Sequence, residues 1–81
     1  MISCNQHDYI EIVCMYQYPI KLTLKSGEAI QGIALDTQRN EQRDECIKIN
    51  VDGVEQLIIL EQIKNLEVMV ENPHLRLVEF D

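Results

Sequence analysis

The chain has little with which to build a large or covalently braced core: no tryptophan, one phenylalanine and three cysteines in 81 residues. An odd number of cysteines does not make the disulfide framework of a small secreted protein. No apolar run approaches the ~18 residues that a membrane span requires, and the N-terminus lacks the basic region of a signal peptide. We therefore expect one cytoplasmic domain over residues 1–81, with no membrane span.

Positive charge is also scarce. Fourteen Asp and Glu residues stand against seven Lys and Arg residues, and the net charge is -7. A chain with this charge is repelled by nucleic acid and by anionic membrane surfaces, so the partner that electrostatics favours is a basic surface. The alternative is that the acidity serves solubility alone.

The stretch from Pro19 to Asp36, PIKLTLKSGEAIQGIALD, predicts a strand, a tight turn and a second, bent strand. Apolar and polar residues alternate after Pro19, which is the pattern of a strand with one wet face. Ser26-Gly27 supplies the turn, because glycine reaches the positive φ angles that a hairpin needs. In a regular strand the side chains of Ile30 and Ile33 would point to opposite faces. A bulge at Gly32 would place both side chains inside.

The rest of the chain predicts one helix before this hairpin and three strands after it. The expected segments are a helix over about 5–17, a loop over 37–44, and strands over 47–51, 54–60 and 63–70. Asp52-Gly53 is a strong hairpin signal, and Asn72-Pro73 ends the last strand. We expect Leu57–Leu60 to be covered on both faces. The tail over 72–81 either adds an edge strand or packs across the barrel.

These segments predict a mainly β fold: an N-terminal α-helix followed by a small, five-stranded, antiparallel open barrel over about 19–71.

In the helix, Asn5 stands where a capping residue would, and Asp8, three residues later, stands where the acid of a capping box would. Tyr9, Ile12, Val13 and Tyr16 are spaced to share one face. The opposite side carries His7, Asp8, Glu11 and Met15. The helix contains no Lys or Arg, so neither acid has a local cationic partner.

Two resemblances add to this interpretation. The segment LTLKSGEAIQGIALD looks like the first motif of the Sm-like fold. More narrowly, ISCNQHDYIEIVC, followed by LTLKSGE and ECIKI, resembles the Rof (YaeO) family of Rho-binding antiterminators. The shared pattern is carried here by Cys4, Asp8, Glu11 and Cys14, and the similarity covers nearly the whole chain.

The second resemblance implies an inhibitor of Rho-dependent transcription termination. Such a protein binds the terminator Rho at its primary RNA-binding sites and blocks access of RNA. The resemblance implies that the helix docks on Rho, with His7, Asp8 and Glu11 as the main contacts. We extend the expected surface to Asn5, Gln6, Met15, Arg39 and Arg43. No cofactor and no catalysis are expected, and the chain is expected to be a monomer.

Other classes of function remain as alternatives. Cys4, His7, Cys14 and Cys46 could assemble a metal site, although zinc sites more often use paired Cys-x-x-Cys motifs. An Sm-like ring that binds RNA is the second alternative, but the expected turn at Glu61-Gln62 carries no cation to meet a phosphate. An enzyme is disfavoured, because the chain has no glycine-rich phosphate loop and no recognisable nucleophile-histidine pair. Arg39 and Arg43 could serve loop solubility alone.

Overall fold

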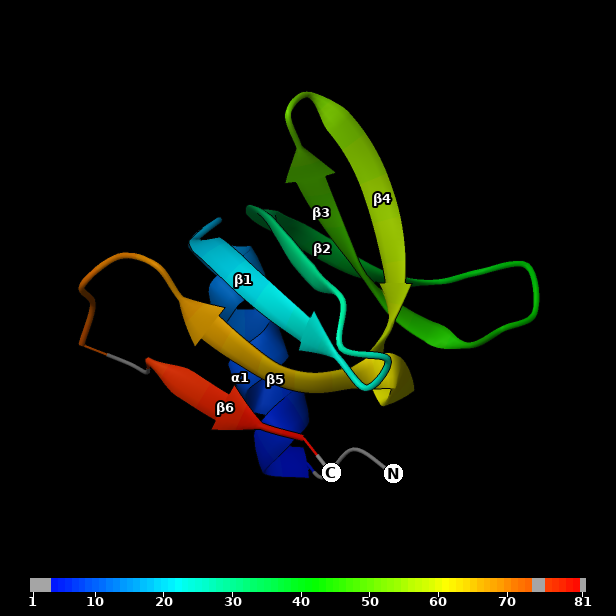
Figure 1. Cartoon of the computed structure of the whole chain (residues 1–81), viewed down its shortest axis with the longest axis horizontal. Helices are drawn as coiled ribbons and strands as arrows, with labels where there is room; N and C mark the ends of the chain where they lie inside the picture. Colours follow the sequence, from blue (N-terminus) through cyan, green and yellow to red (C-terminus); the bar gives the residue numbers. More distant parts are fainter. Residues whose placement is uncertain (1–3, 74–75, 81) are drawn as a thin grey trace.

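The structure is a computed structural model, and it describes residues 4–73 and 76–80 and, of Cys4, the backbone. In that part of the chain one helix precedes six antiparallel strands (Figure 1). The elements are α1 (Cys4–Met15), β1 (Pro19–Leu24), β2 (Ala29–Arg39), β3 (Glu45–Val51), β4 (Val54–Ile59), the short 3₁₀ helix η1 (Leu60–Gln62), β5 (Ile63–Val68) and β6 (Leu77–Glu79). The expected mainly β fold with an N-terminal helix is confirmed.

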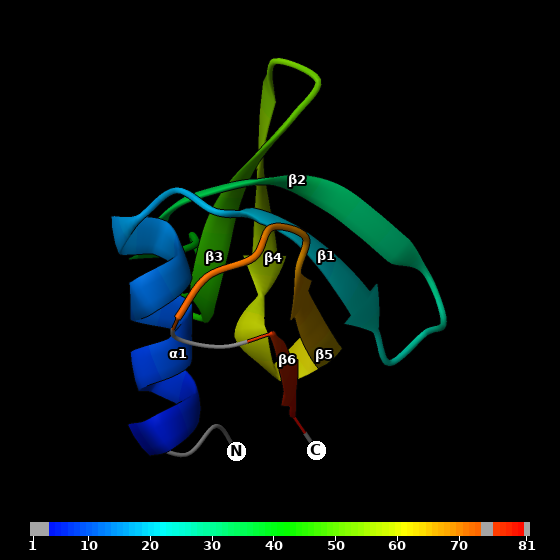
Figure 2. The same ribbon diagram turned by 90° about the vertical axis from the view of Figure 1, so that its left-hand side faces the viewer.

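The six strands form one open sheet in the order β4-β3-β2-β1-β5-β6. The expected count of five is one too low, because part of the tail pairs with β5 as an edge strand, with Leu66 opposite Val78. Figure 2 shows α1 on one side of this curved sheet. Among the described residues, no helix is both long and apolar enough to cross a membrane.

The bend in β2 does not lie at Gly32, where the sequence predicts a bulge. Gly32 pairs regularly with Ile20, and the register shifts between Ala34 and Asp36 instead. As a result Ala34 is fully buried, whereas Ile33 remains 38% exposed. Gly32 has a different role: a Cβ atom built on it would lie 2.5 Å from the backbone oxygen of Asn50. Close approach of β3 therefore requires glycine at this position.

The loop after β2 is shorter than expected. Residues 37–39 continue β2, and their partners lie in the first half of β3. The remaining loop, 40–44, is closed by two hydrogen bonds between its ends. Asn40 N donates to the backbone oxygen of Asp44 at 3.1 Å, and Asp44 N donates to Asn40 Oδ1 at 2.9 Å. Arg43 takes the positive φ of 66° that closes the turn.

The helix begins and ends earlier than expected, and it buries a different face. Since α1 begins at Cys4, Asn5 lies inside the first turn and does not cap the helix. The buried residues are Ile10, Val13 and Cys14, whereas Tyr9 and Tyr16 are exposed. Periodicity alone did not distinguish these neighbouring faces, because apolar residues occur on both.

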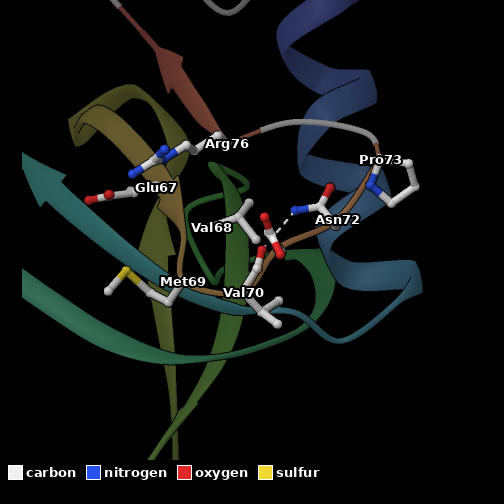
Figure 3. A pocket seen from close by; sticks show the side chains of 8 residues that line it. Glu67, Val68, Met69, Val70, Asn72, Pro73 and Arg76 are labelled. Atoms are coloured by element: carbon white, nitrogen blue, oxygen red, sulfur yellow. Dashed lines mark hydrogen bonds between the residues drawn. The ribbon is translucent and has the colours of Figure 1, made fainter.

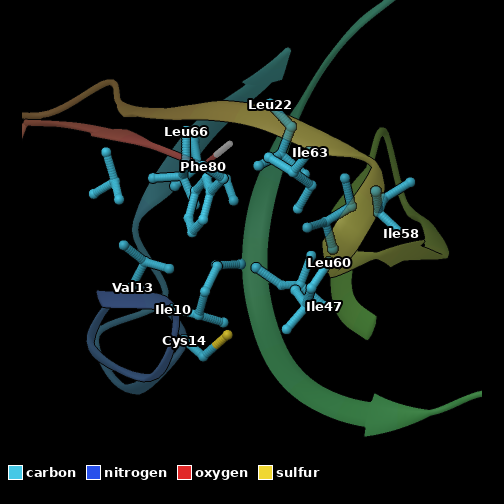
Figure 4. Packing of buried hydrophobic residues seen from close by; sticks show 14 of the residues in the cluster. Ile10, Val13, Cys14, Leu22, Ile47, Ile58, Leu60, Ile63, Leu66 and Phe80 are labelled. Atoms are coloured by element: carbon cyan, nitrogen blue, oxygen red, sulfur yellow. The ribbon is translucent and has the colours of Figure 1, made fainter. Parts of the chain in front are cut away.

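The core lies between α1 and the sheet, and every element of the fold contributes to it (Figure 4). Its buried members are Ile10, Val13, Cys14, Ile20, Leu22, Ala34, Ile47, Ile49, Ile58, Leu60, Ile63, Leu66, Val68, Val78 and Phe80. Of β4, only Ile58 belongs to this core, and Leu57 remains 39% exposed. The expectation that β4 is covered on both faces is therefore wrong.

Candidate partner-binding surface

The outward side of α1 presents an exposed acidic stripe. Asp8 and Glu11 lie one turn apart and both are exposed. Met15 continues the stripe toward the C-terminal end of the helix and is 71% exposed. Within residues 4–73 and 76–80, the salt bridges include neither carboxylate. Both acids are thus available to a partner without first breaking an ion pair.

The stripe extends onto the sheet through a residue that the sequence did not single out. Burial, the carboxylate of Asp36 and the carboxylate of Glu11 together raise the pKa of the Cys14 thiol to about 12. Glu11 belongs to α1 and Asp36 to β2, the strand against which α1 packs. Asp36 is exposed, and its Oδ1 accepts a hydrogen bond from the backbone N–H of Thr37 at 2.8 Å.

His7 faces the β2–β3 loop rather than open solvent. Its Nε2 atom lies 3.6 Å from Oε2 of Glu45, and Oε1 of the same carboxylate lies 3.9 Å from Nη2 of Arg39. Nη1 of Arg39 donates a hydrogen bond to the carbonyl oxygen of Arg43 at 2.6 Å. Three residues that the sequence placed in the site thus meet in one hollow. Glu45 joins them, and no local pattern pointed to it.

This hollow has a volume of about 360 Å³. It is lined by His7, Arg39, Arg43, Asp44, Glu45, Ile59, Leu60 and Glu61. The two arginines lie among three acids, so it is not the uniformly cationic groove that a phosphate backbone requires. We interpret it as the mixed-charge border of the acidic stripe.

Two further helix residues that were expected in the site, Asn5 and Gln6, lie on different sides of α1. Asn5 is exposed on α1. Gln6 points elsewhere: its Nε2 atom donates a hydrogen bond to the backbone oxygen of Glu79 at 2.8 Å, which joins α1 to β6. The structure therefore separates Gln6 from the acidic stripe.

Within the described residues, Cys14, Cys46 and His7 are not grouped as metal ligands. Cys14 and Cys46 are buried, and the side chain of Cys4 lies outside the described residues. Burial and the carboxylate of Asp44 raise the pKa of the Cys46 thiol, as burial does for Cys14. A protonated thiol is a poor metal ligand. In the described part of the chain, no group of three or more His, Cys, Asp or Glu side chains is placed to hold a metal ion.

A second hollow, of about 770 Å³, lies where β5 leads into the segment before β6 (Figure 3). It is lined by Glu67, Val68, Met69, Val70, Glu71, Asn72, Pro73 and Arg76. Asn72 Nδ2 donates a hydrogen bond to the backbone oxygen of Val70 at 3.0 Å. Among the described residues, this lining contains none of those expected in the site and no nucleophile with a general base.

The family model described as modulator of Rho-dependent transcription termination (ROF) matches residues 1–80. The chain belongs to the ROF family. The family is one of transcription modulators, so the resemblance seen in the sequence is confirmed.

Solved structures similar to this ROF chain include YaeO bound to magnesium from Vibrio cholerae O395. The two share 42% sequence identity and a TM-score of 0.88, and the match covers 91% of this chain and 96% of that chain. The search of the curated proteins gives no match. The magnesium belongs to the Vibrio structure.

Proposed function

We propose that this ROF chain binds Rho directly at its primary RNA-binding sites and thereby prevents RNA from entering them. The observation that carries the proposal is the acidic stripe: Asp8 and Glu11 are exposed, one turn apart, on a helix with no Lys or Arg. The surrounding chain has a net charge of -7. Such a surface fits a basic cleft and competes with an anionic ligand for it.

The chemistry of the competition is the replacement of phosphates by carboxylates. A cleft that binds RNA offers cations and hydrogen-bond donors to the phosphate backbone. Carboxylates accept the same charge-assisted hydrogen bonds, which contribute about 1.5–3 kcal/mol each. Because Asp8 and Glu11 have no salt bridge within the described chain, no internal ion pair opposes their transfer to the partner.

His7, Arg39 and Arg43 form the border of this surface. The Glu45 carboxylate holds His7 and Arg39 beside the acidic stripe. We propose that the two arginines make secondary contacts with acidic or backbone groups of Rho. Salt bridges between exposed groups contribute little on their own, so these contacts add orientation more than affinity.

On this proposal the protein acts by occupancy, without catalysis and without binding RNA itself. It works in the cytoplasm, where Rho acts on transcription. The net charge of -7 supports the absence of RNA binding, because binding to a polyanion requires released counterions and therefore cationic contacts.

The test reverses the charge of the stripe. In the variant Asp8→Lys/Glu11→Lys we expect binding to Rho to weaken by about 2–5 kcal/mol, because each new cation faces a basic cleft. Titration of Rho by calorimetry, and displacement of labelled single-stranded RNA from Rho, measure the loss. The matched control is Glu28→Lys/Glu71→Lys, which changes the net charge equally at two exposed positions outside α1.

Two results would contradict the proposal. One is a stripe variant that displaces RNA from Rho as well as the unmodified chain does. The other is a gel shift of the same RNA by this protein in the absence of Rho, which would make it an RNA binder instead of a competitor.

A further inference from the structure

We infer that Tyr16 is an aromatic anchor of the same surface, and that it takes the place of a nucleobase in the cleft where Asp8 and Glu11 take the place of phosphates. This inference rests on the proposed function and deepens it. It concerns a residue that the sequence assigned to the apolar face of the helix, and that the structure places on the surface with 52% of its area exposed.

The backbone fixes Tyr16 as the C-cap residue, directly after Met15, the last residue of α1. Its N–H still donates to the Ile12 carbonyl oxygen at 3.1 Å. The next two N–H groups reach back, from Gln17 to the Cys14 oxygen at 3.2 Å and from Tyr18 to the Val13 oxygen at 3.0 Å. With the positive φ of 51° at Gln17, this is a Schellman motif, which closes a helix in one defined conformation.

The ring of Tyr16 is also held in place. It stacks on the ring of Tyr18, with centroids 5.4 Å apart and planes 19° apart. Tyr18 in turn packs against the hydrophobic core. An exposed aromatic ring that is supported in this way loses little conformational entropy when a partner covers it. Tyr16 therefore has the properties of a preorganised anchor.

Tyr16 lies next to the C-terminal end of the acidic stripe, because it directly follows Met15, the exposed residue that continues the stripe. Asp8, Ile12 and Tyr16 follow one another at intervals of four residues, and each step turns about 40° round the helix axis, so the ring stands on the face that adjoins the carboxylates. Exposed Met15 lies next to them. The helix thus presents carboxylates near its beginning and middle and an aromatic ring at its end.

This order of groups matches what a cleft for single-stranded RNA recognises. Such clefts combine cations that follow the backbone with aromatic side chains on which bases stack, and stacking tolerates different rings. A protein that offered only carboxylates would leave the stacking positions of the cleft unfilled. The partner that fits the whole face is a basic cleft with exposed aromatic rings, and a supported tyrosine ring supplies the missing stacking surface.

The experiment compares three substitutions of Tyr16 by titration of Rho over a series of salt concentrations. Tyr16→Phe keeps the ring, and we expect its affinity to stay within twofold. Tyr16→Leu keeps apolar bulk without a π face, and Tyr16→Ser removes both; for each we expect a fall on the order of tenfold. Val54→Ser, at an exposed apolar position on β4, is the control and should bind as the unmodified chain does.

The dependence on salt separates the two kinds of contact. Stacking involves no ion release, so the Tyr16→Leu variant should lose affinity equally at every salt concentration. The Asp8→Lys/Glu11→Lys variant should change the slope of log K against log salt concentration. Circular dichroism confirms that each variant remains folded, and the comparison of Tyr16→Phe with Tyr16→Leu decides the question even if Tyr16→Ser unfolds.

The outcomes are distinct. If Tyr16→Leu binds as tightly as the unmodified chain while the stripe variant does not, Tyr16 is no anchor and the proposed function stands. If both variants bind normally, the proposed function fails as well. If Tyr16→Phe is as weak as Tyr16→Leu, the hydroxyl group rather than the ring is what the partner recognises, and the inference is wrong.

Discussion

At the scale of single residues, Gly32 shows how a position can be special for a reason other than backbone freedom. The sequence predicts a bulge there, whereas Gly32 pairs regularly with Ile20 on one side of β2. What distinguishes it is the backbone of β3, whose Asn50 oxygen occupies the space that a Cβ atom would need. The side chain is absent so that two strands can approach closely.

We therefore expect Gly32→Ala to lower the free energy of unfolding by about 1–3 kcal/mol, the usual cost of forcing extra atoms into a packed site. The loss should exceed the ~0.4–1 kcal/mol that alanine restores by restricting the unfolded chain. Urea denaturation measures it, with Gln31→Ala as the control at the exposed neighbouring position. Unchanged stability in Gly32→Ala would show that β3 can move away at no cost.

At the scale of elements, α1 is the part of the chain in which local pattern was least decisive. Apolar residues lie on two adjoining faces, and the sheet covers only the one with Ile10, Val13 and Cys14. The other retains Tyr9 and Tyr16 at the surface. The helix therefore has one buried side, and its surface carries the acidic stripe with the exposed tyrosines on the adjoining face.

The end of α1 yields a prediction about stability. Gln17 holds a positive φ of 51°, a conformation that costs a non-glycine residue roughly 1–2 kcal/mol. Gln17→Gly removes this cost, partly offset by the greater freedom of glycine in the unfolded chain. We expect a gain of up to about 1 kcal/mol in the free energy of unfolding, measured by thermal denaturation. Gln17→Val, which is β-branched, should be less stable than the unmodified chain; the reverse order would contradict the role of the motif.

At the scale of the whole molecule, the open sheet has one long edge and one short edge. β4 forms the first, and β6 covers β5 at the second. The hydrogen bonds from Val68 N to the Arg76 oxygen and from Phe80 N to the Lys64 oxygen bracket this pairing. Val78 and Phe80 are buried, so β6 both shields the β5 edge and contributes to the core. A shielded edge disfavours association of copies through strand pairing.

We accordingly expect the chain to be a monomer in size-exclusion chromatography with light scattering. Because N–H groups alternate in direction along an antiparallel strand, residues 76, 78 and 80 face β5 and residue 77 faces away. Val78→Pro should detach β6 and produce association that depends on concentration. Leu77→Pro should remain monomeric, since its N–H is not in the ladder. Association of the unmodified chain at low concentration would contradict the expected monomer, through either the open β4 edge or an unshielded β5 edge.

Much of the fold and part of the candidate site could be predicted from local sequence. The alternation of apolar and polar residues after Pro19 predicts a strand, and the Asp52-Gly53 turn predicts a hairpin. Both occur as expected, and Val51 pairs with Val54 across the turn. The exposed positions of Asp8 and Glu11 follow from helical spacing and a lack of basic neighbours. Such patterns can be predicted from the sequence because each depends on residues that are close together in the chain.

The sequence by itself thus determined the class of fold, the acidic character of the helix and, through its motif, the family. Only the tertiary structure decided which helix face is buried, that the tail adds β6 beside β5, and that Glu45 joins His7 to Arg39. It also moved Tyr16 from the expected apolar face to the surface. Each of these results depends on segments that are distant in the chain and meet only when the sheet packs against α1, so no local pattern carries the information.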